Sequence, residues 1–556
     1  MTHLTRRKKG GKTYYYLART TRINGKPRQI IMRSLGTAED MENVFKKAND
    51  SIPEIKPDFC RIYQFGAEAA LLNIAERLGV ANIIDELAPN NEQGLSVGSY
   101  MVLAAINRAV QPTSQKSFYE WFQKTVLSDA FPQANEKTLS GQNFWRHTHG
   151  LDQSILTSIE DKITKNIIEK YDIDTNCLLF DNKKFITYID TSNPALIPQC
   201  GHSKEKRSDL KIIGLSLLAS PDSNIPLFHE TYQENRCDST QSTNIIDKLK
   251  LRFSKISNKS DEITLVFDKG NNSDQAIENL KNDSLGKFPF VGGLCLNQGQ
   301  ELIELKGEQY EPLKGDFEGS SAFRLRKEIS GREFTVLITD DPRLRKTQLV
   351  GLRRNIVKCE KEFFALQESL KLREEGQILR GKTRTVVSTL KNIQKIFSIK
   401  YMKNIFTYNI TEDDNNIILS YSLDKNKYNF FVNNYLGKTI IFTNRDEWSN
   451  EQIVSTYRSQ FHVKEAFKQI KNIKHLSFRP VRHFTDNMMT IHSFYCVLAF
   501  TLSCLLQLEM EKLGFKMSVN AVLNEFSEAK QTLNFYLGET KEKPTVASVF
   551  SEMSPG

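Results

Sequence analysis

Two aspartates end apolar runs in this chain of 556 residues. Asp181 ends the run CLLFD, and Asp268 ends the run ITLVFD just before KGNNS. Short apolar runs that include β-branched residues and are bounded by turn signals predict strands buried on both faces. The carboxylate that ends such a strand reaches the sheet edge, where open α/β sheets bind ligands. Two aspartates on neighbouring strands can share divalent metal ions, as metal-assisted phosphoryl transfer requires.

The distribution of charge indicates that the substrate of this phosphoryl transfer is a nucleic acid, whose backbone is a chain of phosphodiesters. The formal net charge is +10. Residues 1–33 contain ten Lys or Arg and no acidic residue, and residues 343–400 contain fifteen basic and five acidic residues. These two surpluses predict two surfaces that face phosphate backbones. A disordered tail and a solvated helical face remain the alternatives for the two segments.

The N-terminal third of the chain is predicted to contain two DNA-binding regions. Residues 1–60 read as a basic β segment, in which Asn24-Gly25 supplies a hairpin turn. Residues 61–172 read as a helical region for DNA binding or dimerisation, because apolar residues recur at spacings of three and four.

The rest of the chain predicts an α/β fold. Residues 173–295 run through three strands, a helix, a strand, a helix and a strand, which is the order of the first part of an RNase H-like catalytic core with a mixed sheet. Residues 296–436 interrupt this order as a large insertion with a long basic helix and short strands, one of them at 429–432. The core resumes over 437–515 with a last strand and a long helix at 451–473. Residues 516–556 are predicted to be a C-terminal helical tail.

Cysteine usage and hydropathy indicate the compartment. The eight cysteines contain no CxxC pair, so neither a zinc ribbon nor a disulfide framework is indicated. This usage predicts a reducing, cytoplasmic location. The apolar stretch from Phe494 includes Thr501 and Ser503 and predicts a buried helix. No membrane partner is expected.

Three segments resemble the DDE transposases of the insertion-sequence-four superfamily, in the branch with an N-terminal β segment. They are GHSKEKRSDL from Gly201, IPLFHETYQENRCDS from Ile225 and DKGNNS from Asp268. The resemblance continues through NEQIVSTYRSQFHVKEAFKQIK and HLSFRPVRHFTDNMMTIHSFYCVLAF. It covers nearly the whole chain and is weakest in the insertion.

The resemblance implies an RNase H-like domain in which two Asp and one Glu hold two Mg²⁺, with Mn²⁺ as a substitute. Asp181 is then the first catalytic and metal-binding residue, and Asp268 is the second. The implied activity is the cutting and joining of the ends of the chain's own insertion sequence. The implied partners are double-stranded DNA, as terminal inverted repeats and as target, and a second copy in a homodimer.

The third ligand of the family pattern is where this chain departs. The pattern places a Tyr, a Glu seven residues on and a Lys seven further on one helix face. Here these positions are Tyr457, Lys464 and Lys471, so a lysine stands where the Glu is expected, and Glu465 follows it. A one-residue step turns a side chain by about 100°. Glu465 can therefore serve as the catalytic and metal-binding residue only if the helix rotates or locally unwinds.

Three interpretations remain open. Glu465 replaces the missing ligand, or the Lys464 ammonium neutralises the aspartates and leaves a transposase-derived DNA-binding protein with impaired chemistry. The third is an RNase H-like nuclease, against which the basic insertion and N-terminal segment argue. The residues predicted to contact DNA are Arg6, Arg7, Lys8, Lys9, Lys12, His202, Lys204, Lys206, Arg207, Tyr457, Lys464, Lys468 and Lys471.

Overall fold

The computed structural model forms two compact units, Met1–Tyr63 with Lys530–Gly556, and Gln64–Ala529. The residues that it describes are 2–23, 26–50, 56–89, 94–201, 207, 209–221, 224–233, 248, 252, 263–268, 289–294, 300–303, 309–329, 331–375, 377, 385–413, 416–472, 474–478, 481, 483–537 and 545–551.

The first unit contains two sheets of three strands each. One has the order β1 (Thr2–Lys9), β2 (Lys12–Ile23), β3 (Lys26–Gly36), and helix α1 (Ala38–Asp50) contacts β2 and β3. The prediction of N-terminal strands is therefore confirmed. The other sheet has the order β18 (Thr545–Phe550), β17 (Lys530–Tyr536), β4 (Phe59–Gln64).

The prediction of a helical C-terminal tail is wrong beyond α19 (Val519–Glu528). Residues 530–536 and 545–550 are strands β17 and β18, because their β-branched and aromatic residues favour extended structure. The aromatic ring of Phe535 stacks on that of Phe59 at a centroid distance of 4.5 Å, and this contact holds β17 against β4.

The second unit begins with the predicted helical region. Its helices enclose α18 (Asp486–Lys512), which is, among the described residues, the one helix long and apolar enough to cross a membrane. The whole apolar window of α18 is buried inside the protein, as predicted for the stretch after Phe494. The other helices are α2 (Gly66–Leu78), α3 (Val80–Leu87), α4 (Val97–Val110), α5 (Phe118–Phe122), α6 (Leu127–Ala130), α7 (Gly141–Thr148) and α8 (Gln153–Tyr171).

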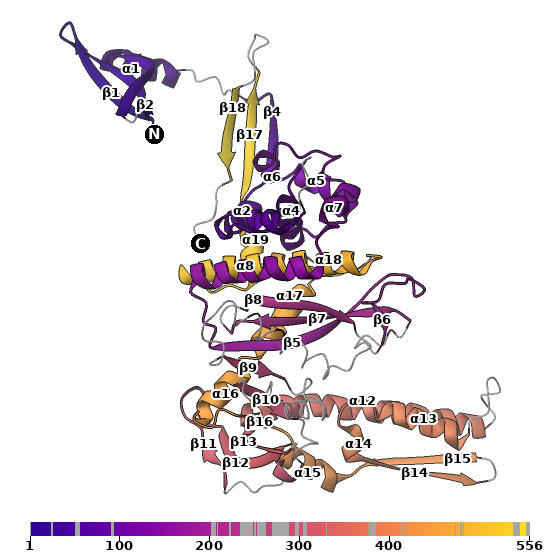
Figure 1. Ribbon diagram of the computed structural model, residues 1–556. Helices are drawn as coiled ribbons and strands as arrows, with labels where there is room; N and C mark the ends of the chain where they lie inside the picture. Colours follow the sequence, from indigo (N-terminus) through magenta and orange to yellow (C-terminus); the bar gives the residue numbers. More distant parts are fainter. Residues whose placement is uncertain are drawn as a thin grey trace. The chain divides into compact units, whose positions relative to one another are not determined.

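A mixed sheet forms the centre of the second unit (Figure 1). Its central order is β8-β7-β5-β9-β10, with β7 antiparallel to both β8 and β5, and with β9 parallel to β5 and to β10. The strands are β5 (Cys177–Ile186), β6 (Gln199–Cys200), β7 (Lys211–Ala219), β8 (Pro226–Gln233), β9 (Thr264–Phe267), β10 (Phe290–Leu294), β11 (Glu311–Pro312), β12 (Ser321–Ile329), β13 (Arg332–Asp340) and β16 (Lys438–Thr443).

Part of the predicted insertion belongs to this sheet. Strand β16 pairs antiparallel with both β10 and β13, so β11, β12 and β13 extend the sheet on that side. The other part has its own hydrophobic core. That part contains α12 (Pro342–Glu374), α13 (Val386–Ile396), α14 (Met402–Ile405), β14 (Phe406–Asp413), β15 (Asn416–Leu423) and α15 (Lys425–Asn434). The strand predicted at 429–432 is wrong, because Asp424 caps α15 and this segment is helical.

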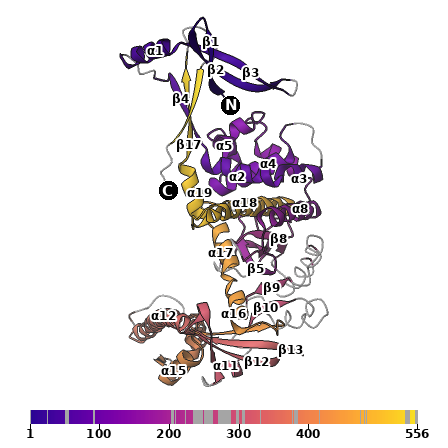
Figure 2. The ribbon, with the colours of Figure 1, turned by 90° about the vertical axis from the view of Figure 1, so that its left-hand side faces the viewer.

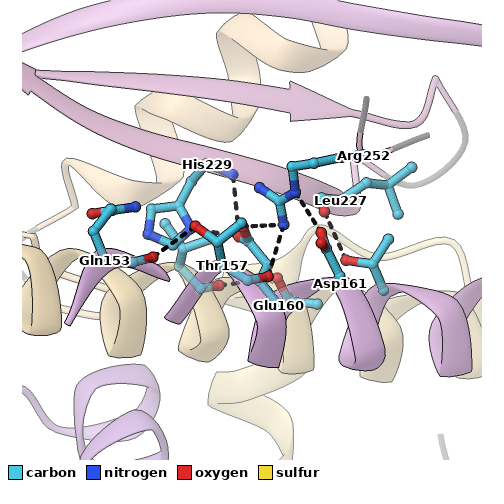
Figure 3. A network of polar contacts seen from close by, with 10 residues as sticks. Gln153, Thr157, Glu160, Asp161, Leu227, His229 and Arg252 are labelled. Carbon is cyan, nitrogen blue, oxygen red and sulfur yellow. Dashed lines mark hydrogen bonds and ion pairs between the residues drawn. The ribbon is translucent and has the colours of Figure 1, made fainter. Parts of the chain in front are cut away.

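A buried ionic network joins the helical region to the sheet (Figure 3). Arg252 donates a hydrogen bond of 2.9 Å to Glu160 on α8 and also pairs with Asp161, while His229 on β8 contacts Glu160. Burial alone would raise the pKa of the Glu160 carboxyl, but the charges of His229 and Arg252 outweigh it and hold that pKa below its ordinary value. The guanidinium of Arg252 also lies 4.0 Å from the ring centroid of Phe228.

Replacing Arg252 by Ala is expected to destabilise the fold by about 3–5 kcal/mol, because it removes the guanidinium that pairs with both Glu160 and Asp161 and leaves these buried carboxylates less compensated. Lys248→Ala is the matched control, because the side chain of Lys248 is 57% exposed in its pair with Glu230. Its loss should cost less than about 1 kcal/mol. Urea denaturation measures both, and equal losses would contradict a structural role for the network.

The buried carboxyl of Glu68 on α2 should make the free energy of unfolding depend on pH. Its side chain is buried, and burial raises its pKa from 4.5 to about 7. Between these values the unfolded chain releases a proton that the folded chain keeps, so stability falls as pH rises through this window. Glu68→Gln should therefore raise the free energy of unfolding near pH 8 by about 3 kcal/mol and leave it unchanged near pH 4. Melting curves at both values test this, and a pH-independent difference would contradict it.

Candidate active site

The pairing of β5 with β9 places the two predicted aspartates side by side. The strands are parallel, and Phe180 is paired with Phe267. Asp181 and Asp268 are the next residues on each strand, so their side chains leave the sheet on the same face. Asp181 does not end its strand as predicted, because β5 continues to Ile186 by pairing with β7. The parallel partner β9 ends at Phe267, one residue before Asp268. Asp181 is buried, with 4% of its surface exposed.

Two helices, and not the single predicted one, cover this face. They are α16 (Asn450–Arg458) and α17 (Phe461–Ile470), which pass from β16 and β10 across β9 to β5 and β7 (Figure 2). Between them the backbone tightens, because the Gln460 N–H bonds to the carbonyl of Tyr457, three residues back. The hydroxyl of Ser459 donates to the Thr456 carbonyl and supports this local turn.

The turn leaves both Tyr457 and Lys464 directed at Asp268. The Lys464 ammonium lies 2.7 Å from Oδ2 of Asp268, and the Tyr457 hydroxyl donates to Oδ1 at 3.4 Å. Gly293 on β10 permits this approach, since a Cβ atom there would lie 2.3 Å from the Tyr457 hydroxyl. A larger residue at 293 would displace the tyrosine from the site.

Asp181 has a lysine partner of its own. Its Oδ2 lies 2.6 Å from the ammonium of Lys183, and its Oδ1 accepts from the Asn182 N–H at 2.9 Å. Lys183 is two positions further along β5, so it lies on the same sheet face. Its ammonium also lies 5.5 Å from the ring centroid of Phe467 on α17. Lys183 is therefore an ammonium partner of Asp181, as Lys464 is of Asp268.

The side chains as they stand do not fit a pair of magnesium ions. Two carboxylates supply hard oxygen ligands, but each is bound to an ammonium group, and Lys464 holds the position of the expected third carboxylate. Glu465 contacts Lys468 at 3.2 Å and Gln469 at 3.1 Å, away from Asp268. Within the described residues, no three His, Cys, Asp or Glu side chains form a group that could hold a metal ion.

The predicted DNA-binding residues fall into four groups, of which the last lies outside the described residues. Tyr457 and Lys464 contact Asp268, and near them on the sheet face the Lys471 ammonium lies 5.2 Å from the Phe185 ring. Lys468 is exposed in its pair with Glu465, and Arg207 pairs with Asp209. The other unit contains the exposed side chains of Arg6, Arg7, Lys8, Lys9 and Lys12. His202, Lys204 and Lys206 lie outside the described residues.

Two residues of the site were missed by sequence reasoning. Lys183 could have been found, because its spacing of two from Asp181 on a strand places both on one face. Gly293 belongs to the pair Gly292-Gly293 within a strand, which is a signal of close approach by another group. The approaching group, Tyr457, is more than 150 residues away in the sequence and is found only from the fold.

Comparison with known proteins identifies no family. No protein-family model matches the sequence, and no curated protein matches it. Among solved structures, the chain is similar to the piggyBac transposase in a synaptic complex with hairpin DNA, studied by electron cryomicroscopy. The likeness covers 82% of this chain and 79% of that one, with 9% sequence identity and a TM-score of 0.34. Such a low score indicates a distant likeness only.

Proposed function

We propose that this chain acts on DNA as a DDE transposase does, with Asp181 and Asp268 as the carboxylates that face the scissile phosphate. The observation that supports this best is the parallel pairing of β5 and β9, which puts both aspartates on one face. The strand order β8-β7-β5-β9-β10, with its directions, supports an RNase H-like core. Phosphoryl transfer of this kind draws on divalent metal as a Lewis acid, and Asp181 and Asp268 could hold such an ion only where Lys183 and Lys464 release them.

The charge of the surface supports DNA as the partner. The N-terminal sheet presents exposed arginine and lysine side chains, and so does α12, with Arg353, Arg354, Lys358 and Lys361. Such side chains bind phosphates by releasing counterions, and their affinity for DNA falls as salt is added. In this proposal the two basic surfaces position duplex DNA, and the aspartate face acts on a strand. A homodimer would hold both ends of an insertion sequence.

A second function is favoured by the ion pair between Lys464 and Asp268. An ammonium group at 2.7 Å from Oδ2 supplies positive charge to the position that a metal ion would occupy. The chain as written would then be a DNA-binding protein of transposase type with little or no cleavage. The residue at position 464 distinguishes the two functions, because every other feature of the site is common to them.

The test is to replace Lys464 by Glu and measure nicking of a supercoiled plasmid that contains the DNA flanking this chain's gene. The substitution changes the local charge by two units and restores a third carboxylate. Cleavage in Mg²⁺ or Mn²⁺ should rise at least about tenfold, which corresponds to about 1.4 kcal/mol, a modest gain because the Lys464 side chain is 45% exposed and solvent screens its pair with Asp268. No cleavage by this variant would contradict the proposed phosphoryl-transfer site.

Three further variants serve as controls for the Lys464→Glu result. Lys464→Gln removes the ammonium without adding a carboxylate and should cut less than Lys464→Glu. Adding Asp268→Asn to Lys464→Glu should abolish the gain. Glu465→Ala in the unmodified chain should have no effect, because Glu465 contacts Lys468 and Gln469. If the unmodified chain cuts well and Glu465→Ala stops it, then Glu465 is the third ligand.

A further inference from the structure

The N-terminal sheet has one covered and one open face. Ala18 on β2 is fully buried, and α1 contacts β2 and β3. Leu17, the preceding residue, is 36% exposed, and its cross-strand partner Leu4 is 57% exposed. Since successive residues of a strand point to opposite faces, Ala18 marks the covered face and Leu4 and Leu17 mark the open one.

The pairing register identifies the residues of this open face. Leu4 lies opposite Leu17, which lies opposite Arg33, and Thr2 lies opposite Arg19, which lies opposite Ile30. Alternation along the strands adds Arg6 and Lys8 on β1 and Arg28 on β3. Lys26 on β3, two residues before Arg28, lies on the same face. The open face therefore presents six exposed basic side chains around the apolar side chains of Leu4, Leu17 and Ile30, namely Arg6, Lys8, Arg19, Lys26, Arg28 and Arg33.

This composition fits the major groove of duplex DNA. The outer strands of a three-stranded sheet lie roughly 10 Å apart, compared with a groove about 12 Å wide. Arginine forms two hydrogen bonds with guanine in that groove, and apolar side chains contact the methyl group of thymine. Residues 1–33 contain no acidic side chain that would repel the phosphates. A protein partner would not require this uniform positive charge.

We propose that the open face of β1-β2-β3 enters the major groove and reads base sequence. Arg19 and Leu17 on the central strand contact base edges, and the outer residues Arg6, Lys8 and Arg28 contact phosphates. Arg7 and Lys9 alternate with these on β1, so their side chains, although also exposed, point away from the groove and contribute little. This inference rests on the proposed DNA binding. Of the five N-terminal basic residues that the sequence predicts to contact DNA, it assigns that contact to Arg6 and Lys8.

The alternation along β1 provides a matched pair of variants. Arg6→Ala/Lys8→Ala and Arg7→Ala/Lys9→Ala remove the same charge from adjacent positions on opposite faces. Binding of the full chain to a labelled mixed-sequence duplex of about 30 base pairs is measured by anisotropy over a range of salt concentrations. The first variant should lower the slope of log affinity against log salt by about two, and the second should leave it near the parent value. Circular dichroism confirms that both are folded.

Base reading is tested by selection from a pool of randomised duplexes. Arg19→Ala should reduce the preference for guanine at one position by about fivefold to a hundredfold. Arg22→Ala, on the covered face of the same strand, should leave the selected sequence unchanged. Equal slopes for the two double variants, or an unchanged selection with Arg19→Ala, would overturn the groove assignment while leaving DNA binding intact. Absence of binding by the parent chain at low salt would instead contradict the proposed function.

Discussion

Two carboxylates placed side by side repel each other, and this repulsion is the constraint around which the site is built. Neighbouring strands lie about 4.8 Å apart, so carboxylates at adjacent positions on two strands lie close enough to repel each other. Lys183 supplies positive charge to Asp181 from the same strand, and Lys464 supplies it to Asp268 from a covering helix. The two ion pairs thus offset the repulsion between the aspartates on this face.

The elements around this pair hold the second lysine in place. The tightened turn between α16 and α17 directs Tyr457 and Lys464 at the same carboxylate, and Gly293 gives the tyrosine its space. The Glu160–Arg252 network fixes β8 to helix α8 of the helical region. Among the described residues of α17, Lys464 is the one whose ammonium group contacts Asp268.

Much of the core could be predicted because its strands are buried on both faces. Runs such as those of β7 and β9 have no exposed residue and stand out in the sequence as apolar. Strand β12 was missed, because it is partly exposed and its apolar residues alternate with Arg and Lys. The helical segment at 429–432 contains phenylalanine and valine, which favour strands, and its cap at Asp424 decides the outcome.

The site was predicted in part for similar reasons. The aspartates were found from their apolar runs, and Lys464 was found from the spacing of the helix that resembles a known pattern. The break at Ser459 and Gln460 was not, because both residues are tolerated in helices and only the local hydrogen bonds reveal it. Glu465 contacts Lys468 because the backbone breaks at this point. The spacing of residues in the sequence does not reveal that break.

The central claim is that the residue at position 464 determines whether the aspartate pair holds metal. Crystals of the Lys464→Glu protein, grown with Mn²⁺ and measured at the manganese absorption edge, test it most directly. The account predicts an anomalous peak within roughly 2–2.5 Å of carboxylate oxygens of both Asp181 and Asp268, and no such peak in the unmodified protein. A peak of equal height at this position in both proteins would contradict it.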